Sequence, residues 1–207
     1  MKVTIKQINK EPYSAFFDIV RDNCVIGTIQ LDGFPLTREA NIKINILGKD
    51  FSVVKDNKTL STDKHFRSHT VFGFEKQGSI CQKYEKDGFF SSKVYYHGLT
   101  YSNKDYRMYP IGMGEYSVCP VYLNGTQVAE LTKNFTVKND LHEFVIYGDN
   151  EKDIISTVII TAYMYLIAYY NPGSKPINTI HKGFSKCTEK RTLAKFNPDF
   201  VKSFEGE

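Results

Sequence analysis

The sequence lacks several features that mark common classes of protein. It has no Trp, and its four Cys (Cys24, Cys81, Cys119 and Cys187) include no CxxC pair among 207 residues. Such widely separated Cys argue against a zinc site and against a compact disulfide framework, so we expect reduced thiols, as in the cytosol. The first residues alternate like a strand, and no apolar stretch follows that would form a signal peptide. These absences predict a cytoplasmic protein.

Familiar catalytic and phosphate-binding motifs are also missing. The sequence contains no nucleophile elbow and no HExxH motif, and Ile111-Gly112-Met113-Gly114 lacks the Lys and Ser/Thr that a nucleotide loop needs. Asp63, His65 and His69 have a spacing that could hold a metal if they lay on a helix. Residues 72–74 beyond them are typical of a strand, however, so a solvated loop is favoured. We expect no enzyme activity, no metal and no cofactor.

An excess of positive charge is confined to the C-terminal part of the chain. The net charge is +4 and the sequence pI about 8.7, which is less basic than a typical nucleic-acid-binding domain, and no recognised module is present. Residues 171–207 hold seven Lys or Arg against four Asp or Glu, which leaves the remainder nearly neutral. We therefore expect no nucleic-acid partner.

Short alternating segments rich in β-branched and aromatic residues dominate residues 13–147. Their spacing between turn residues is typical of an antiparallel sandwich or barrel. Asn124-Gly125 is the most specific signal, because both central positions of a type I′ turn need positive φ. We predict further turns at Arg21-Asp22-Asn23 and Gly48-Lys49-Asp50, and place His97 in a turn before Gly98. With residues 1–8 the segments make about twelve strands, and closing them into a barrel would remove exposed edges.

One long apolar segment interrupts this β pattern. Residues 154–170 (IISTVIITAYMYLIAYY) contain no charged residue, and a helix that is apolar all round is buried in protein or in a membrane. Asn150 and Asp153 offer capping oxygens at its start, and Asn171-Pro172-Gly173 would end it. The sequence therefore predicts a helix over residues 151–170.

The composition of this helix favours burial in protein over a transmembrane segment. Its 17 uncharged residues are at the lower limit for crossing a bilayer, and four Tyr reduce the hydropathy further. A twelve-stranded barrel also has an interior too wide to be filled by its own side chains. We expect the helix to fill that interior, with Tyr163 and Tyr165 buried.

This order of elements resembles the tubby C-terminal-like superfamily, which includes the LURP-one-related and phospholipid scramblase families and small bacterial relatives. The resemblance rests on FDIVRDNCVIGTI at residues 17–29, VYLNGTQVAE at residues 121–130 and the helix at 151–170. It implies a twelve-stranded antiparallel barrel around a central hydrophobic helix over residues 1–171, followed by a basic extension over residues 172–207. Many relatives stop soon after the helix, and no motif matches the lipid-contacting residues of tubby proteins.

The tail after the helix combines positive charge with apolar residues. Its candidate contacts for an anionic surface are Lys182, Lys186, Lys190, Arg191 and Lys195. Interleaved Phe, Ile and Leu residues would serve as apolar anchors in a peripheral membrane contact. The same composition also suits a strap that packs its apolar side chains on the barrel and keeps its lysines in solvent.

In the superfamily that this chain resembles, tubby domains bind phosphoinositides and scramblase-like proteins act at membranes. The resemblance therefore implies a non-enzymatic binding module for anionic phospholipid headgroups. Its expected location is cytoplasmic and peripheral to the membrane, without a transmembrane segment. The alternative is a protein-interaction or structural domain that has no lipid ligand. The sequence leaves the partner and the oligomeric state open.

Overall fold

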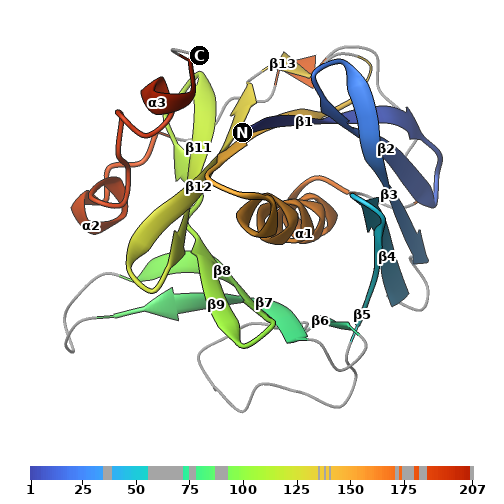
Figure 1. Cartoon of the computed structure of the whole chain (residues 1–207), viewed down its shortest axis with the longest axis horizontal. Coiled ribbons are helices and arrows are strands. Elements are labelled where there is room, and N and C mark those ends of the chain that lie inside the picture. The colour runs from blue at the N-terminus through green and yellow to red at the C-terminus, as the bar shows by residue number, and fades with distance from the viewer. Residues whose placement is uncertain are drawn as a thin grey trace.

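The computed structural model describes residues 1–34, 39–55, 72–74, 78–86, 93–134, 136–137, 139, 141–170, 173, 180–181 and 186–205. Across these residues the protein is mainly antiparallel β-structure with one long helix (Figure 1), as the sequence predicts. The strands are β1 (Lys2–Lys10), β2 (Ser14–Arg21), β3 (Cys24–Phe34), β4 (Glu39–Ile46), β5 (Lys49–Lys55), β6 (Phe72–Phe74), β7 (Gly78–Glu85), β8 (Val94–Tyr101), β9 (Lys104–Met108), β10 (Ile111–Gly112), β11 (Tyr116–Leu123), β12 (Thr126–Asn134), β13 (Thr136–Val137), β14 (Glu143–Gly148) and β15 (Ile180–His181). The helices are α1 (Glu151–Ala168) and the four-residue helices α2 (Lys190–Leu193) and α3 (Lys202–Glu205).

Thirteen strands form one sheet in the order β10-β11-β12-β14-β1-β2-β3-β4-β5-β6-β7-β8-β9. β9 also pairs with β11, through Met108 and Val121 and the two residue pairs beside them. The strand pairings therefore run around a ring that returns to β11. The shortest steps of this ring are the two residue pairs between β5 and β6 and the three pairs each between β6 and β7 and between β9 and β11. β13 and β15 form a separate two-stranded sheet.

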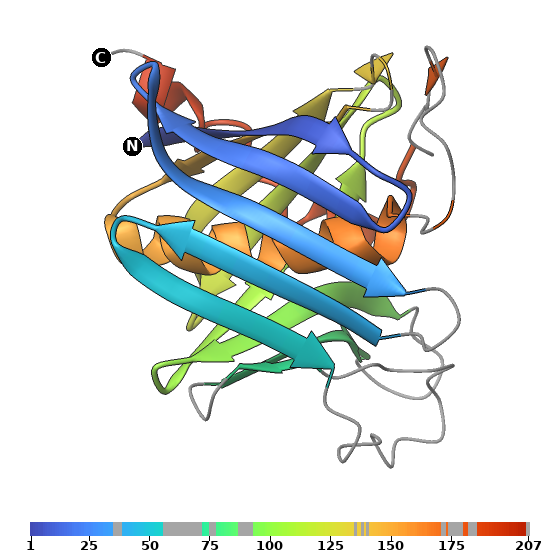
Figure 2. The ribbon, with the colours of Figure 1, turned by 90° about the vertical axis from the view of Figure 1, so that its right-hand side faces the viewer.

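Four two-residue turns join neighbouring strands at one end of the large sheet, which we call the turn end. Both central residues of each turn have φ between 50° and 84°, the backbone of a type I′ turn. The turns are Asp22-Asn23, Leu47-Gly48, Ser102-Asn103 and Asn124-Gly125. Figure 2 shows the first two at the left.

Two of the predicted turns need correction, whereas the turn at Asn124-Gly125 is confirmed. The turn predicted at Gly48-Lys49-Asp50 is one residue late, because β5 begins at Lys49 and Leu47 takes a left-handed conformation with φ 51°. His97 was predicted to lie in a turn, but it lies inside β8 and is 4% exposed. Its pairing with Met108 of β9 and its buried ring place it in the sheet.

Helix α1 begins at the predicted cap and ends two residues earlier than predicted. The Asn150 side-chain oxygen accepts hydrogen bonds from the backbone N–H groups of Lys152 and Asp153, and the Asn150 amide donates to the Asp153 carboxylate at 2.7 Å. These bonds satisfy donors that the first turn of a helix leaves open. Residues 153–165 are buried, including Tyr163 and Tyr165 at 3% and 1% exposure, as predicted.

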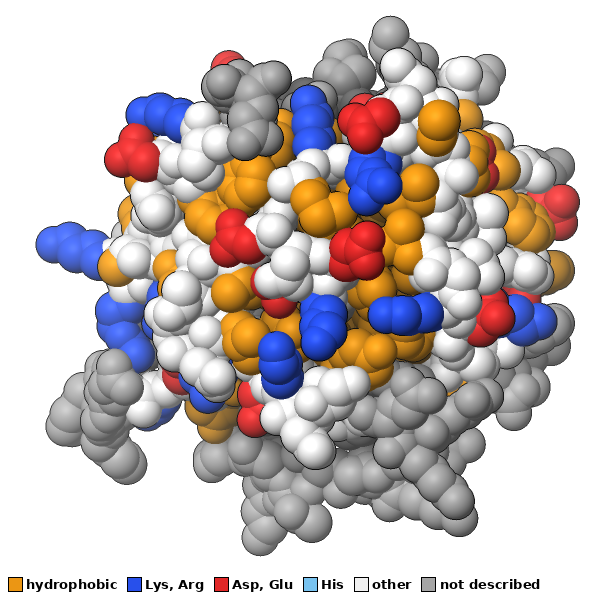
Figure 3. Space-filling view, in the orientation of Figure 1, with side chains coloured by type: hydrophobic (Ala, Val, Ile, Leu, Met, Phe, Trp, Pro, Cys, Tyr) orange, Lys and Arg blue, Asp and Glu red, His pale blue; other side chains and the backbone are white. Residues whose placement is uncertain are grey.

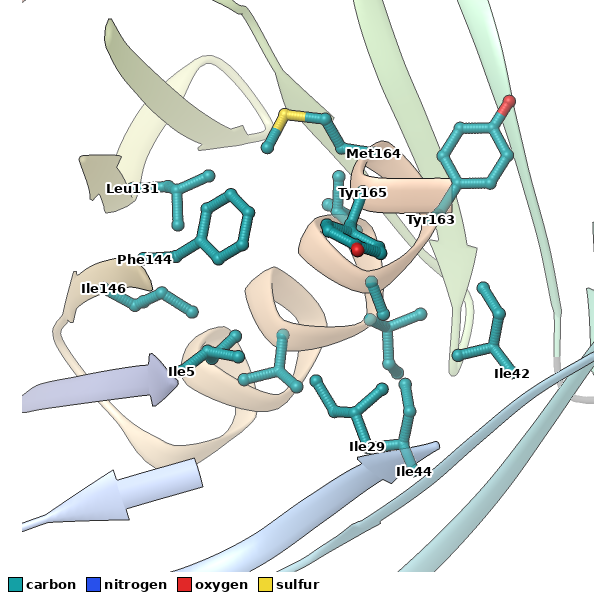
Figure 4. Packing of buried hydrophobic residues seen from close by; sticks show 14 of the residues in the cluster. Ile5, Ile29, Ile42, Ile44, Leu131, Phe144, Ile146, Tyr163, Met164 and Tyr165 are labelled. Carbon is teal, nitrogen blue, oxygen red and sulfur yellow. The ribbon is translucent and has the colours of Figure 1, made fainter. Parts of the chain in front are cut away.

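The buried side chains of α1 and of the strands belong to one hydrophobic cluster. Figure 4 shows α1 between Leu131 and Phe144 on one side and Ile42 and Ile44 on the other. Burial of such a side chain contributes about 1.5–3 kcal/mol, so contacts on several sides hold the helix in place. The end of the sheet at which α1 terminates is opposite the turn end (Figure 2), and we call it the far end.

Candidate functional site

Most of the large apolar side chains that are exposed among the described residues lie at the far end. Seven large apolar side chains are at least 41% exposed, and six of them lie where strands or α1 meet the far end. These six form what we call the apolar rim: Ile8, Tyr13, Val54, Tyr95, Tyr116 and Ile167. The seventh is Val25, which is 59% exposed and lies beside the Asp22-Asn23 turn at the turn end. The rim is therefore a property of one end of the molecule.

Positive charge lies beside the apolar rim. The Lys93 ammonium is 4.3 Å from the centroid of the Tyr84 ring, which in turn lies 6.2 Å from the ring of Tyr95. The exposed Lys186 lies next to Cys187, whose N–H donates to the Gly112 carbonyl at 2.8 Å. β10, which contains Gly112, pairs with the first residues of β11 at the far end. Two lysines thus flank the rim at β8 and near β11.

The turn end has a different surface. Figure 3 shows this end, where basic and acidic side chains are interspersed among apolar ones. A surface of alternating charge offers little net attraction to an anionic partner. The far end also has exposed acidic residues, such as Glu11 and Glu115, so the apolar rim makes it the better candidate for binding a membrane surface.

The predicted basic residues of the tail have different environments. We call residues 186–205 the strap. Within it Lys186 and Lys190 are exposed, whereas Arg191 and Lys195 are half-buried; Lys182 lies outside the described residues. The Lys195 ammonium is 2.9 Å from the Glu85 carboxylate, so its charge is paired within the molecule. This difference has no local signal in the sequence, because Glu85 lies far away along the chain.

The strap packs on the outer face of the sheet (Figure 1). The Tyr122 hydroxyl of β11 donates to the Lys195 carbonyl at 2.9 Å, and the ring of Tyr147 in β14 lies 6.0 Å from that of Phe204. β12 lies between β11 and β14 in the sheet, so the strap crosses it between these two contacts. This arrangement agrees with the alternative of a strap on the sheet. The domain boundary at residue 171 stays a prediction.

Beneath the strap lies a small aromatic cluster that is separate from the main core. It consists of Val94, Tyr96, Tyr109 and Tyr122. The ring of Tyr109 is 2% exposed, and burial together with the negative charge of Glu85 raises the pKa of its hydroxyl to about 12. The cluster faces outward, because Tyr122 lies between Val121 and Leu123 of the core along β11 and Tyr96 precedes His97, whose ring contacts Tyr163 of α1.

Glu130 is a buried carboxylate where the strap crosses β12. Its neighbours Ala129 and Leu131 belong to the core, so Glu130 faces outward, yet it is 2% exposed. It pairs with Pro120 of β11 and Tyr147 of β14. Burial raises the pKa of Glu130 to about 7, against a hydrogen bond of 3.1 Å from the Gln127 amide that lowers it.

The interior also contains buried polar side chains, and His97 is one of them. The ring of His97 lies 5.7 Å from that of Tyr163, and burial lowers the pKa of His97 to about 4, which keeps the imidazole neutral near pH 7. The described residues contain no group of three His, Cys, Asp or Glu that could hold a metal ion. The candidate metal ligands Asp63, His65 and His69 lie outside the described residues.

The sheet also has a shallow polar hollow on the outer face of β3, β4 and β5. Its volume is about 320 Å³, and its lining includes Thr28, Gln30, Lys43 and Ser52. Several of its polar groups already make hydrogen bonds: the Asn45 amide donates to the Asp50 carboxylate at 2.8 Å, and the Gln30 amide donates to the Asp32 carboxylate. A ligand would have to compete with these bonds, so the hollow is a weaker candidate than the rim.

Comparison with models of known protein families found no match to the chain, and comparison with curated proteins and with solved structures found none either. Among the helices that the structure describes, none is both long and apolar enough to cross a membrane.

Proposed function

We propose that this protein is a non-enzymatic binding module that contacts anionic phospholipid surfaces through the apolar rim at its far end. The observation that carries the proposal is the placement of six of the seven exposed large apolar side chains at that end. Aliphatic side chains gain free energy when they leave water, and Tyr suits the boundary between headgroups and acyl chains. A membrane surface offers both environments to a rim of Ile, Val and Tyr.

Electrostatic attraction would add to this contact. A lysine near an anionic bilayer contributes about 1 kcal/mol to binding, and Lys93 and Lys186 lie beside the rim. Of the basic tail residues, Lys186, Lys190 and the half-buried Arg191 keep the proposed role of anionic-surface contacts, and Lys182 stays a prediction. Lys195 contributes less, because Glu85 pairs its charge. The protein would then be cytoplasmic and peripheral to the membrane.

We also propose that the ring of strand pairings is a barrel with α1 at its centre, as the resemblance to the tubby C-terminal-like superfamily implies. The pairing of β9 with β11 and the core that α1 shares with strands on several sides support this. Because such a helix fills the interior, a ligand would bind on the outside or at an end of the barrel. The rim is the part of that outer surface that suits a membrane.

Co-sedimentation with vesicles tests the proposal. At low salt we expect the full chain to sediment with vesicles that contain phosphatidylserine and to remain in solution with vesicles of phosphatidylcholine alone. Ile8→Ser with Ile167→Ser should reduce the bound fraction at least about fivefold, because two exposed apolar contacts are lost. The matched control is Val25→Ser, which removes an equally exposed apolar side chain from the opposite end.

Two results would contradict the proposal. If the chain does not sediment with anionic vesicles at low salt, the lipid-binding proposal is wrong. The alternative of a protein-interaction or structural domain then replaces it. If Val25→Ser reduces sedimentation as much as the rim variant does, binding does not occur through the far end.

A further inference from the structure

One lysine of the strap is bound by groups of the folded sheet. Lys195 is bound through both its side chain and its main chain. Its ammonium lies 2.9 Å from the Glu85 carboxylate and 4.9 Å from the centroid of the Tyr109 ring. Its carbonyl accepts a hydrogen bond of 2.9 Å from the Tyr122 hydroxyl. These groups come from β7, β11 and the segment after β9, so the folded sheet brings them together.

The groups that surround Lys195 are held in place without it. The Arg107 guanidinium is 3.4 Å from the Glu85 carboxylate and stacks 5.3 Å from the centroid of the Tyr96 ring. The Tyr109 hydroxyl donates to the same carboxylate at 3.4 Å, and the rings of Tyr96 and Tyr122 lie 5.6 and 5.8 Å from that of Tyr109. Aromatic faces and a carboxylate are the groups that favour an alkylammonium ion.

The strap itself has few means of staying ordered alone. α2 and α3 have four residues each, and helices of this length are not stable in isolation. Its contacts with the sheet include those of Cys187, Lys195 and Phe204. A short segment that packs on the outside of a sheet opens at a lower free-energy cost than the core.

We propose that the outer face formed by Glu85, Tyr109 and Tyr122 is a docking site for a lysine-containing peptide segment of a partner protein, and that the strap occupies it as an intramolecular ligand. The partner segment carries Lys in the place of Lys195. Its main-chain carbonyl takes the hydrogen bond from Tyr122. This site lies on the outer face of the sheet, and its Glu85 pairs with Val94, the residue before Tyr95 of the apolar rim.

A labelled peptide of residues 187–197, with Cys187 replaced by Ser, tests the proposal in fluorescence polarisation. The full chain with Lys195→Ala should bind it about tenfold more tightly than the unchanged chain, because the internal competitor is weakened. The control variant is Lys190→Ala, which removes an exposed lysine of the strap and should bind the peptide as weakly as the unchanged chain. Hydrogen exchange should be faster over residues 190–196 in Lys195→Ala and unaltered in Lys190→Ala.

The specificity of the site is tested from both sides. A peptide in which Lys195 is replaced by Gln should bind the Lys195→Ala chain at least about tenfold more weakly, since the charge and its ring contact are lost. Adding either Tyr122→Phe or Glu85→Gln to the Lys195→Ala chain should weaken binding of the unmodified peptide. If one of these two variants fails to fold, the other still tests the site. The proposal fails if the two peptides bind equally, if neither binds at about 1 mM, or if exchange over residues 190–196 is unaltered in Lys195→Ala.

Discussion

The hydroxyl of Tyr106 donates a hydrogen bond of 3.2 Å to the carboxylate of Asp153, which joins β9 to the first turn of α1. Both side chains are buried, at 1% and 3% exposure. Burial raises the pKa of Asp153, while the hydrogen bonds from Tyr106 and Asn150 oppose that shift. This contact fixes the start of α1 against the strand that completes the ring.

Removing this hydrogen bond should destabilise the protein. Tyr106→Phe keeps the ring but leaves a buried carboxylate with one donor fewer, so we expect the free energy of unfolding to fall by about 1–3 kcal/mol. Urea denaturation measures the change. Tyr116→Phe, at an exposed rim position, is the matched control and should change stability by less than about 0.5 kcal/mol. Equal stability of Tyr106→Phe and the unchanged chain would show that this bond does not hold α1.

Glu130 should make stability depend on pH. Its pKa is raised from 4.5 to about 7 in the folded state, so the folded protein binds a proton more tightly than the unfolded chain. The stability from this shift is fully present below about pH 4.5 and is lost as the pH rises through about 7. Glu130→Gln, which carries no charge, should therefore stabilise the protein by about 1–3 kcal/mol at pH 8.5 and by much less at pH 5.

Urea denaturation at the two pH values checks this expectation. Glu143→Gln changes an exposed carboxylate of β14 and serves as the control, which should change stability by less than about 0.5 kcal/mol. An effect of Glu130→Gln that is the same at pH 5 and pH 8.5 would show that Glu130 is not buried as a titrating group.

The approach of β3 to β4 should not tolerate a side chain at Gly27. A Cβ there would lie 2.2 Å from the Asn45 carbonyl oxygen, and backbone cannot move aside as a flexible side chain can. We expect Gly27→Ala to lower the free energy of unfolding by about 2–3 kcal/mol, measured by thermal or urea denaturation. At Gly98 a Cβ would meet only the side chains of Tyr96 and Lys83, at 3.2 and 3.3 Å. Gly98→Ala should cost less than Gly27→Ala, and the reverse order would contradict the register of β3 and β4.

The main elements could be predicted from the sequence because their signals are local. The helix at 151–168 stands out as an apolar segment with a capping Asn150, and the turn at Asn124-Gly125 follows from the φ angles that those residues tolerate. The turn at Leu47-Gly48 has no such signal, because Leu47 rarely adopts positive φ. It was therefore placed one residue late.

Most of the candidate site could not be predicted from the sequence. Lys195 looked like the other basic residues of the tail, since its partner Glu85 lies on a distant strand. Glu130 alternates with core residues along its strand, which is the pattern of an exposed polar residue. No neighbouring residue in the sequence indicates that the strap covers it. The apolar rim likewise collects residues such as Ile8 and Ile167 from opposite ends of the chain.

Fluorescence of a probe attached at each end of the molecule tests the membrane-binding rim most directly. A chain with Ile8→Cys and Cys24→Ser would carry an environment-sensitive label at the far end, and a chain labelled at Cys24, which is exposed beside the Asp22-Asn23 turn, would carry it at the turn end. On addition of phosphatidylserine vesicles we predict a blue shift of the emission at residue 8 and no shift at Cys24. Equal shifts at both positions, or a shift at Cys24 alone, would contradict binding through the far end.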